Sequence, residues 1–121
     1  MPFDLTTCAK QPTLKLTTTG RKSGSQHTVT IWFVVADARR AYVQHVRGKA
    51  HWFKNLAANP AVQVDFGSGT LPARATPIAD AAEVRRVLAL FRRKYWAAYL
   101  VQLLGITKQP LAAIVELQDP D

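Results

Sequence analysis

The chain has 121 residues, 48% of them hydrophobic, which favours one domain spanning residues 1–121 around a single core. Its 16 Lys and Arg residues against 8 Asp and Glu give a net charge of +8, so we expect an anionic partner: a nucleic acid, an acidic lipid surface or a polyanionic cofactor. The single cysteine, Cys8, excludes an internal disulfide and a Cys-based zinc site, and the absence of a signal-peptide pattern and of any long apolar run predicts a cytoplasmic protein with no transmembrane segment.

Strand patterns dominate the first part of the chain. Residues 13–19 alternate between apolar and polar, and residues 28–35 form a nearly continuous β-branched and aromatic run, which is typical of a strand covered on both faces. A glycine-bounded turn, GRKSG at 20–24, separates them. Residues 36–40 then predict a short turn, and residues 41–46 predict the return strand of a hairpin.

The period of the pattern changes at residues 48–58. Trp52 and Leu56 stand four residues apart there, which predicts a short helix. Alternation returns at 61–66 and again at 70–78, and these two stretches predict another hairpin.

A second helix is predicted from Asp80, which makes a capping-box pattern with Glu83, to Gly105, which is a typical C-terminal stop. Its apolar face is spaced by three and four residues and consists of Val84, Val87, Leu88, Phe91, Tyr95 and Tyr99. Residues 111–117 predict one last strand. This order predicts a mainly β (α+β) fold, in which an antiparallel sheet of about six strands closes into a small barrel with two or three covering helices.

Several common catalytic motifs are absent from the sequence. The GRKSG turn is followed by Ser-Gln, which excludes a P-loop, and Ser23 lacks the surroundings of a hydrolase nucleophile. The three histidines, His27, His45 and His51, do not have metalloprotease spacing, so we expect no protein-ligated metal. No pair of carboxylates stands near a predicted cleft, which leaves glycosidase chemistry unsupported.

The cations gather around two glycine-containing segments instead. Seven Lys and Arg residues and one Asp lie between positions 21 and 54. The GRKSG turn offers backbone N–H groups, the Ser23 hydroxyl and two cationic head groups to a phosphate or carboxylate. Residues 47–49 directly precede the predicted short helix, whose N-terminus favours anions, and Trp52 adds a flat apolar wall. The pattern predicts a site for a nucleotide-like aromatic cofactor; the alternative is a solvated turn and a core tryptophan.

Three motifs occur in a characteristic order: LTTTGRKSG at 16–24, a Val-x-x-Trp-Phe strand, and Gly-Lys-x-x-Trp-Phe-x-Asn-Leu-x-Ala-Asn-Pro at 48–60, followed by Val-Gln-Val at 62–64. Through them the chain resembles the deazaflavin-dependent nitroreductase and quinone-reductase family. That family consists of split β-barrel, FMN-binding-like proteins related to pyridoxamine-phosphate oxidases. The resemblance covers most of the chain from position 15 to about position 95.

The resemblance implies an oxidoreductase that binds coenzyme F-420, an 8-hydroxy-5-deazaflavin with a phosphate and an oligoglutamate tail. Hydride would pass from the reduced deazaflavin to a small organic acceptor, which is a quinone, a nitro compound or an activated alkene. The implied cofactor-binding residues are Arg21, Lys22, Ser23, Gly24, His27, Thr28, Val29, Thr30, Val46, Arg47, Gly48, Lys49, Trp52 and Asn55. Tyr95 and Tyr99 are implied on the substrate side as donors of a proton or a hydrogen bond. Related barrels bind FMN or haem, with or without turnover, and these stay as alternatives.

The chain departs from the family pattern at Gln26-His27, where members often carry Pro-Arg. An imidazole is a weaker anion holder than a guanidinium near neutral pH. The run at residues 96–104 is apolar nearly all round, which predicts a homodimer contact or the lining of an apolar substrate channel.

A nucleic-acid-binding module is the remaining alternative for so basic a chain. Such modules stack bases on exposed aromatic side chains beside the cations. The aromatic residues here fall on both faces of their predicted elements: Trp32, Phe33, Trp52 and Phe53. We therefore expect a small-molecule cofactor and substrate rather than a nucleic acid.

Overall fold

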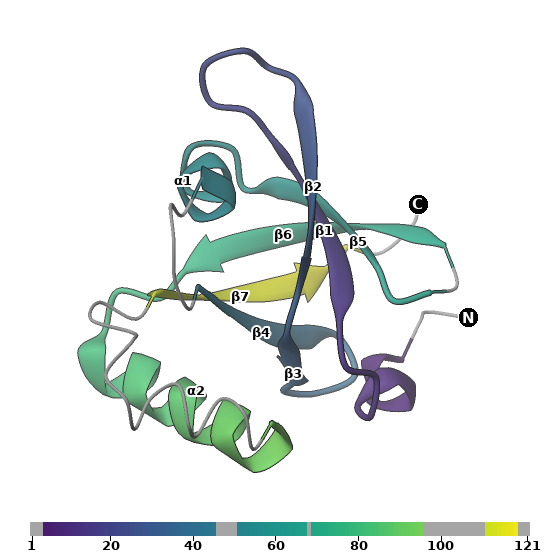
Figure 1. Ribbon diagram of the computed structural model, residues 1–121, viewed down its shortest axis with the longest axis vertical. Helices are drawn as coiled ribbons and strands as arrows, with labels where there is room; N and C mark the ends of the chain where they lie inside the picture. Colours follow the sequence, from purple (N-terminus) through teal and green to yellow (C-terminus); the bar gives the residue numbers. More distant parts are fainter. Residues whose placement is uncertain (1–3, 46–50, 68, 96–110, 119–121) are drawn as a thin grey trace.

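The computed structural model describes residues 4–45, 51–67, 69–95 and 111–118. They form one sheet of seven strands, two α-helices and a short 3-10 helix, η1 (Figure 1). In chain order the elements are η1 (Leu5–Cys8), β1 (Leu14–Thr19), β2 (Gln26–Ile31), β3 (Phe33–Val35), β4 (Arg40–His45), α1 (His51–Ala58), β5 (Ala61–Asp65), β6 (Thr70–Pro77), α2 (Ala81–Lys94) and β7 (Leu111–Leu117).

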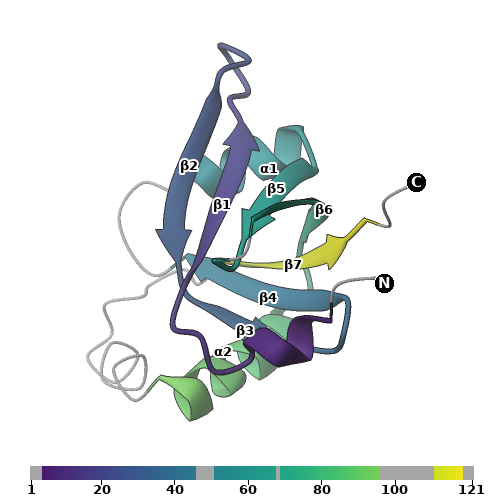
Figure 2. The same cartoon turned by 90° about the vertical axis from the view of Figure 1, so that its right-hand side faces the viewer.

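The sheet is antiparallel throughout, and its strand order is β2-β1-β5-β6-β7-β4-β3. Its two end strands, β2 and β3, are separated in the sequence by Trp32 alone, so the sheet curls until its ends meet at this residue (Figure 2). Within the described residues no ladder joins β2 to β3. The result is a split barrel, as predicted, with seven strands instead of about six.

The single strand predicted at residues 28–35 was wrong, because the chain breaks at Trp32 into β2 and β3. The Trp32 ring stacks on Tyr95, with centroids 4.5 Å apart and ring planes 4° apart. A run of β-branched and aromatic residues carries no local signal for this break. The break depends on a partner 63 positions further along the chain.

The two halves of this run also differ in burial. For β3 the prediction of a strand covered on both faces is confirmed. Phe33 is buried inside the barrel, and Val34 packs against the cluster beneath α2. In β2 the prediction was wrong: Thr28 and Thr30 are exposed, and the strand lies at the end of the sheet.

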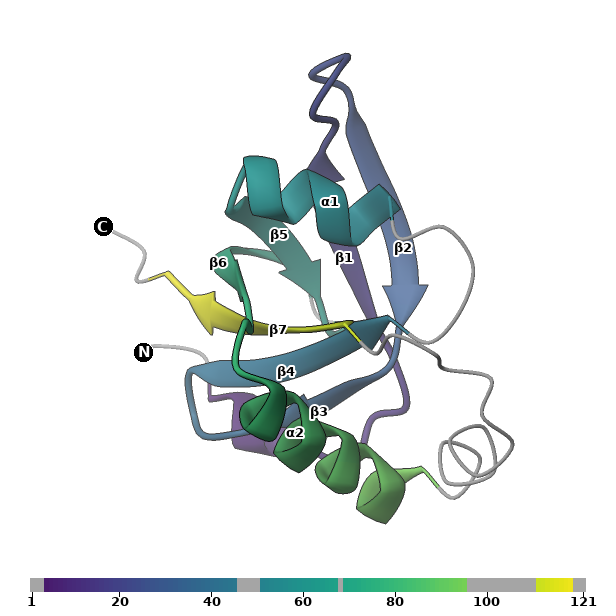
Figure 3. The ribbon, with the colours of Figure 1, turned by 90° about the vertical axis from the view of Figure 1, so that its left-hand side faces the viewer.

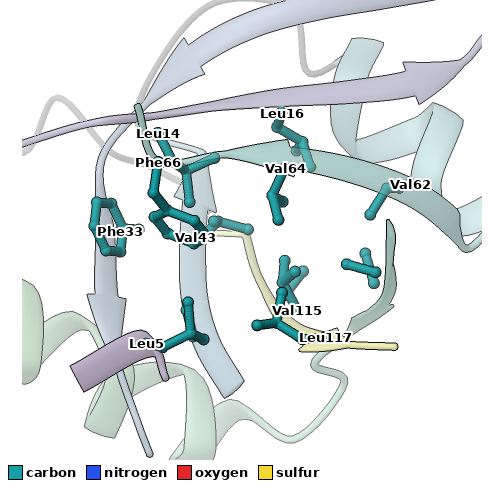
Figure 4. Close-up of a cluster of buried hydrophobic side chains, with 14 of the residues drawn as sticks. Leu5, Leu14, Leu16, Phe33, Val43, Val62, Val64, Phe66, Val115 and Leu117 are labelled. Atoms are coloured by element: carbon teal, nitrogen blue, oxygen red, sulfur yellow. The ribbon is translucent and has the colours of Figure 1, made fainter. Parts of the chain in front are cut away.

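The main core fills the inside of the barrel, where alternate residues of each strand meet (Figure 4). Its larger members include Leu14, Leu16, Phe33, Val43, Val62, Val64, Phe66, Val115 and Leu117. The same interior also receives the small side chains of Ala41, Ala73, Ala75 and Ala113, which leave room for the sheet to curl closely. η1, which was not predicted, adds Leu5 and Cys8 to this core.

α2 covers the outer face of β3, β4 and β7 with Val84, Val87 and Phe91, as the helical spacing predicts. The predicted N-cap is confirmed, because Ala82 N donates to the Asp80 carboxylate at 3.1 Å. The partner of Glu83 is Arg86, which also donates to the Tyr42 hydroxyl.

The predicted continuation of α2 to Gly105 was wrong at Tyr95, which is extended (φ −125°, ψ 104°) and follows the last helical residue, Lys94. Gly105 and the apolar run at 96–104 lie outside the described residues. In the described part of the chain, neither helix has the length and hydropathy needed to cross a bilayer.

Candidate functional site

The β1–β2 hairpin extends beyond the rest of the sheet, and its tip lies beside α1 (Figure 3). A pocket of about 670 Å³ opens between the tip, the inner face of β2 and α1. It is lined by Gly20, Arg21, Lys22, Ser23, Gln26, His27, Thr28, Val29, His51, Trp52 and Asn55. These described lining residues include two permanent cations and no Asp or Glu. The pocket therefore favours an anion.

The tip is a compact turn that uses several of its own backbone amides. Gly20 N donates to Ser25 O at 2.7 Å, Gly24 N donates to Gly20 O at 3.0 Å, and Ser25 N donates to Ser23 Oγ at 3.2 Å. Gly24 takes a left-handed conformation, with φ +74°, that other residues rarely adopt. The amides of Gly20, Gly24 and Ser25 are thus engaged within the turn, and the tip presents its side chains to the pocket instead.

Asn55 connects the two walls of the pocket. The residue is only 5% exposed, and its Oδ1 accepts from Arg21 Nη1 at 2.8 Å and from Arg21 N at 3.3 Å. Its Nδ2 donates to Thr18 Oγ1 in β1 at 3.5 Å. The first turns of α1 are therefore fixed to the hairpin tip, and the Arg21 guanidinium is oriented by a buried amide.

Trp52 belongs both to the core and to the pocket. It is 9% exposed, clusters with Leu56 in the main core and meets Phe53 edge to face at 5.8 Å. It also lines the pocket. Its position fits both predictions for this residue, a core tryptophan and an apolar wall of the pocket.

Two histidines face the same pocket from opposite walls. His27 lies on β2, and a Cβ added to Gly20 would stand 3.1 Å from His27 Nε2 and 2.9 Å from Ser23 Oγ, so the glycine leaves space that these side chains occupy. His51 begins α1 and was not among the predicted site residues. Its position four residues before Asn55 places both on one face of the helix, which is the signal that the sequence offered.

Eight of the predicted cofactor residues line the pocket: Arg21, Lys22, Ser23, His27, Thr28, Val29, Trp52 and Asn55. Two others do not: Gly24 shapes the turn, and Thr30 lines a separate groove with Lys15. Val46, Arg47, Gly48, Lys49 and Tyr99 lie outside the described residues, so their roles stay predictions.

Tyr95 lies away from the pocket and is anchored to the backbone. Its hydroxyl accepts from Phe33 N at 3.3 Å and stands 2.8 Å from Pro12 O and 2.9 Å from Phe33 O, to one of which it donates. Burial raises the pKa of this hydroxyl. These contacts fix the end of α2 against β3, and they do not favour Tyr95 as a proton donor to a ligand in the pocket.

The neighbouring Lys94 is half-buried in the same cluster. Its Nζ donates to Phe33 O at 2.8 Å and lies 3.8 Å from the centroid of the Phe33 ring. Burial lowers the pKa of Lys94 from 10.5 to about 8. The folded state therefore binds fewer protons than the unfolded state between these two values, and the free energy of unfolding rises with pH across this window.

Replacing Lys94 with methionine should remove this pH dependence. Because Lys94 is partly exposed, solvent screening limits the gain in the parent to less than about 1 kcal/mol. The measurement is urea unfolding at about pH 7.5 and about pH 9, a full unit below the ordinary tyrosine pKa of about 10. If the free energy of unfolding changes equally with pH in Lys94→Met and in the parent, Lys94 is not the source of this pH dependence.

Across the described residues there is no cluster of three or more His, Cys, Asp and Glu side chains that could hold a metal ion. The described part of the site is thus a basic pocket with one aromatic wall and two imidazoles.

Several solved structures are similar to this chain. An F420-H2-dependent reductase is 27% identical, with a TM-score of 0.66, over 88% of this chain and 95% of that chain. A structure described as a domain-swapped dimer is also 27% identical, with a TM-score of 0.68, over 88% of this chain and 81% of that chain. A haem storage protein from Vibrio cholerae is 18% identical, with a TM-score of 0.66, over 97% of this chain and 88% of that chain, and this likeness shows the fold alone.

The sequence profile of one family, described as F420H(2)-dependent quinone reductase, matches residues 5–118, nearly the whole chain. The match includes the hairpin tip, β2 and α1, the three parts that form the pocket. The chain therefore belongs to the F420H(2)-dependent quinone reductase family.

Proposed function

We propose that this protein is an F-420-dependent oxidoreductase that passes a hydride from the reduced deazaflavin to a quinone or another small organic acceptor. The observation that carries the proposal is the composition of the pocket. Its described lining contains two cations, Arg21 and Lys22, and the indole of Trp52, and it contains no carboxylate. Cations that no carboxylate neutralises attract the anionic groups of a ligand. An apolar wall suits its ring system. Membership of the family supports the deazaflavin as the ligand.

The residues present fit an anionic, ring-bearing cofactor. Lys22 and the Ser23 hydroxyl would hold its phosphate or tail carboxylates, and Arg21 would do so in the orientation that Asn55 imposes. Trp52 would bound the ring. When bound, reduced F-420 supplies the hydride, so the contribution of these residues is positioning and electrostatics.

Two further parts of the proposal concern residues outside the described ranges. We propose that residues 46–49 complete the anion site, which their place directly before α1 supports. We also propose that residues 96–104 contact a second copy of the chain in a homodimer. The similar structure described as a domain-swapped dimer supports this assembly, which light scattering of the purified protein measures.

The proposed function is tested by titrating the purified protein with F-420 and following absorbance and fluorescence. We expect Lys22→Ala to weaken F-420 binding about five- to tenfold, because it removes one exposed charge-assisted contact worth about 1 kcal/mol. The matched control is Lys10→Ala, which removes a lysine that is also exposed but does not line the pocket.

FMN and haemin serve as competing ligands in the same titration. Binding of FMN or haemin in place of F-420 would replace the cofactor assignment. Equal F-420 affinity in Lys22→Ala and the parent would show that the phosphate or tail lies elsewhere. Turnover is then measured with F-420 in its reduced form and a soluble quinone.

A further inference from the structure

The pocket contains two histidines, one on each wall. His27 stands on the inner face of β2, where its register partner in β1 is the buried Thr18. His51 is the first residue of α1, on the helix face that also carries Asn55. Both histidines are exposed and both line the pocket.

Among the described residues that line the pocket, the charged groups beside these imidazoles are all positive. Arg21 and Lys22 come from the hairpin tip, and the other lining residues of β2 and α1 are uncharged apart from the histidines themselves. Lys54, also on α1, is exposed but is not part of the lining. Within the described lining, no carboxylate is present to pair with a protonated imidazole.

We propose that His27 and His51 are anion-binding residues of this pocket and that they make it hold a ligand with two or more negative charges more tightly as the pH falls. The cofactor to which this applies rests on the proposed function, since F-420 carries a phosphate and several tail carboxylates. The pH dependence itself follows from the lining residues and applies to any polyanion of suitable size.

The physical reason is linkage between proton and anion binding. Imidazole side chains generally take up a proton between about pH 8 and pH 5. A polyanion bound beside His27 and His51 accepts charge-assisted hydrogen bonds from the protonated imidazoles and therefore favours their protonated forms. Anion binding is therefore accompanied by proton uptake, and by reciprocity a lower pH strengthens anion binding.

The test compares dissociation constants at about pH 6 and about pH 8 in the parent, in His27→Gln, in His51→Gln and in the double variant, with F-420 and with inorganic pyrophosphate as ligands. Relative to the double variant, we expect the parent to gain about three- to tenfold in affinity for each ligand between about pH 8 and about pH 6, the range expected from one or two added charge-assisted contacts at an exposed site. Each single variant should lose part of this gain.

The ligands' own titration is common to all four proteins, so the difference between parent and double variant isolates the histidines. An NMR titration of the imidazole signals in the parent gives a readout without any substitution: pyrophosphate should shift the midpoints of both histidines to higher pH. An unchanged ratio in the double variant, together with unmoved midpoints, would overturn this inference while leaving F-420 binding intact. Pyrophosphate binding with the expected ratio but no F-420 binding at either pH would support the inference and overturn the proposed function.

Discussion

Replacing Trp52 with alanine is expected to lower the free energy of unfolding by about 3–5 kcal/mol, the range for truncating a large aromatic side chain in a core. Trp52 is 9% exposed, packs with Leu56 and contacts Phe53. Since domains of this size are stable by only about 5–15 kcal/mol, the loss is a large fraction of the total. Urea unfolding followed by circular dichroism measures it.

The same substitution should also weaken F-420 binding to the folded protein, because the apolar wall of the pocket is lost. The matched control is Phe91→Ala, which empties a fully buried position in the separate cluster beneath α2. It should be destabilised to a similar extent without a change in F-420 affinity. If the alanine variant does not fold, Trp52→Phe, which keeps an aromatic wall, takes its place in the binding measurement. Normal F-420 affinity in folded Trp52→Ala would rule out Trp52 as part of the site.

Local pattern was sufficient to predict most of the barrel. The alternation in β5 puts Val62 and Val64 inside, and the helical spacing in α2 puts Val87 and Phe91 on the sheet, as the structure confirms. These features depend on residues close in sequence. Breaks that depend on distant partners were missed.

Trp32 and Tyr95 illustrate this limit. Each interrupts a segment whose hydrophobic pattern continues without a gap, and each leaves its element to stack on the other. When the helix ends at Lys94, the hydroxyl of Tyr95 accepts from Phe33 N in β3 and donates to the carbonyl of Phe33 or of Pro12. These hydrogen bonds belong to the tertiary structure and are not visible in either segment alone.

The candidate site divides in a similar way. The location of the cations and glycines at a hairpin tip could be predicted from the sequence, because a GRKSG segment between two strands has few other arrangements. The hydrogen bond between Arg21 and Asn55 could not be predicted, since 34 positions separate the two residues. The sequence pattern is equally compatible with an asparagine that contacts a ligand. The structure shows that this asparagine bonds to the tip and to β1.

Replacing Asn55 with alanine is expected to lower the free energy of unfolding by about 1.5–3 kcal/mol, the range for losing a hydrogen bond to a charged group at a mostly buried site. The substitution removes the acceptor of Arg21 Nη1 and Arg21 N and the donor to Thr18 Oγ1. Arg21→Ala should lose part of the same interaction. In a double-mutant cycle the two changes should therefore be coupled by about 1 kcal/mol or more. Additive losses in the cycle would contradict the conclusion that Asn55 stabilises the fold through its hydrogen bonds to Arg21.

Asn55→Asp distinguishes the effect of Asn55 on stability from its effect on ligand binding. An aspartate at this position still accepts from Arg21 N and Nη1, although it loses the donor to Thr18 Oγ1, so by urea unfolding we expect a smaller loss of stability than in Asn55→Ala. It also places a carboxylate in a lining that has none among the described residues, and this charge repels an anion and neutralises Arg21. F-420 affinity should consequently fall about tenfold or more while the fold persists, whereas in Asn55→Ala stability and affinity fall together. If Asn55→Asp binds F-420 as the parent does, the anionic part of the cofactor does not reach the Arg21 side of the pocket, and the phosphate and tail must then be held by other residues.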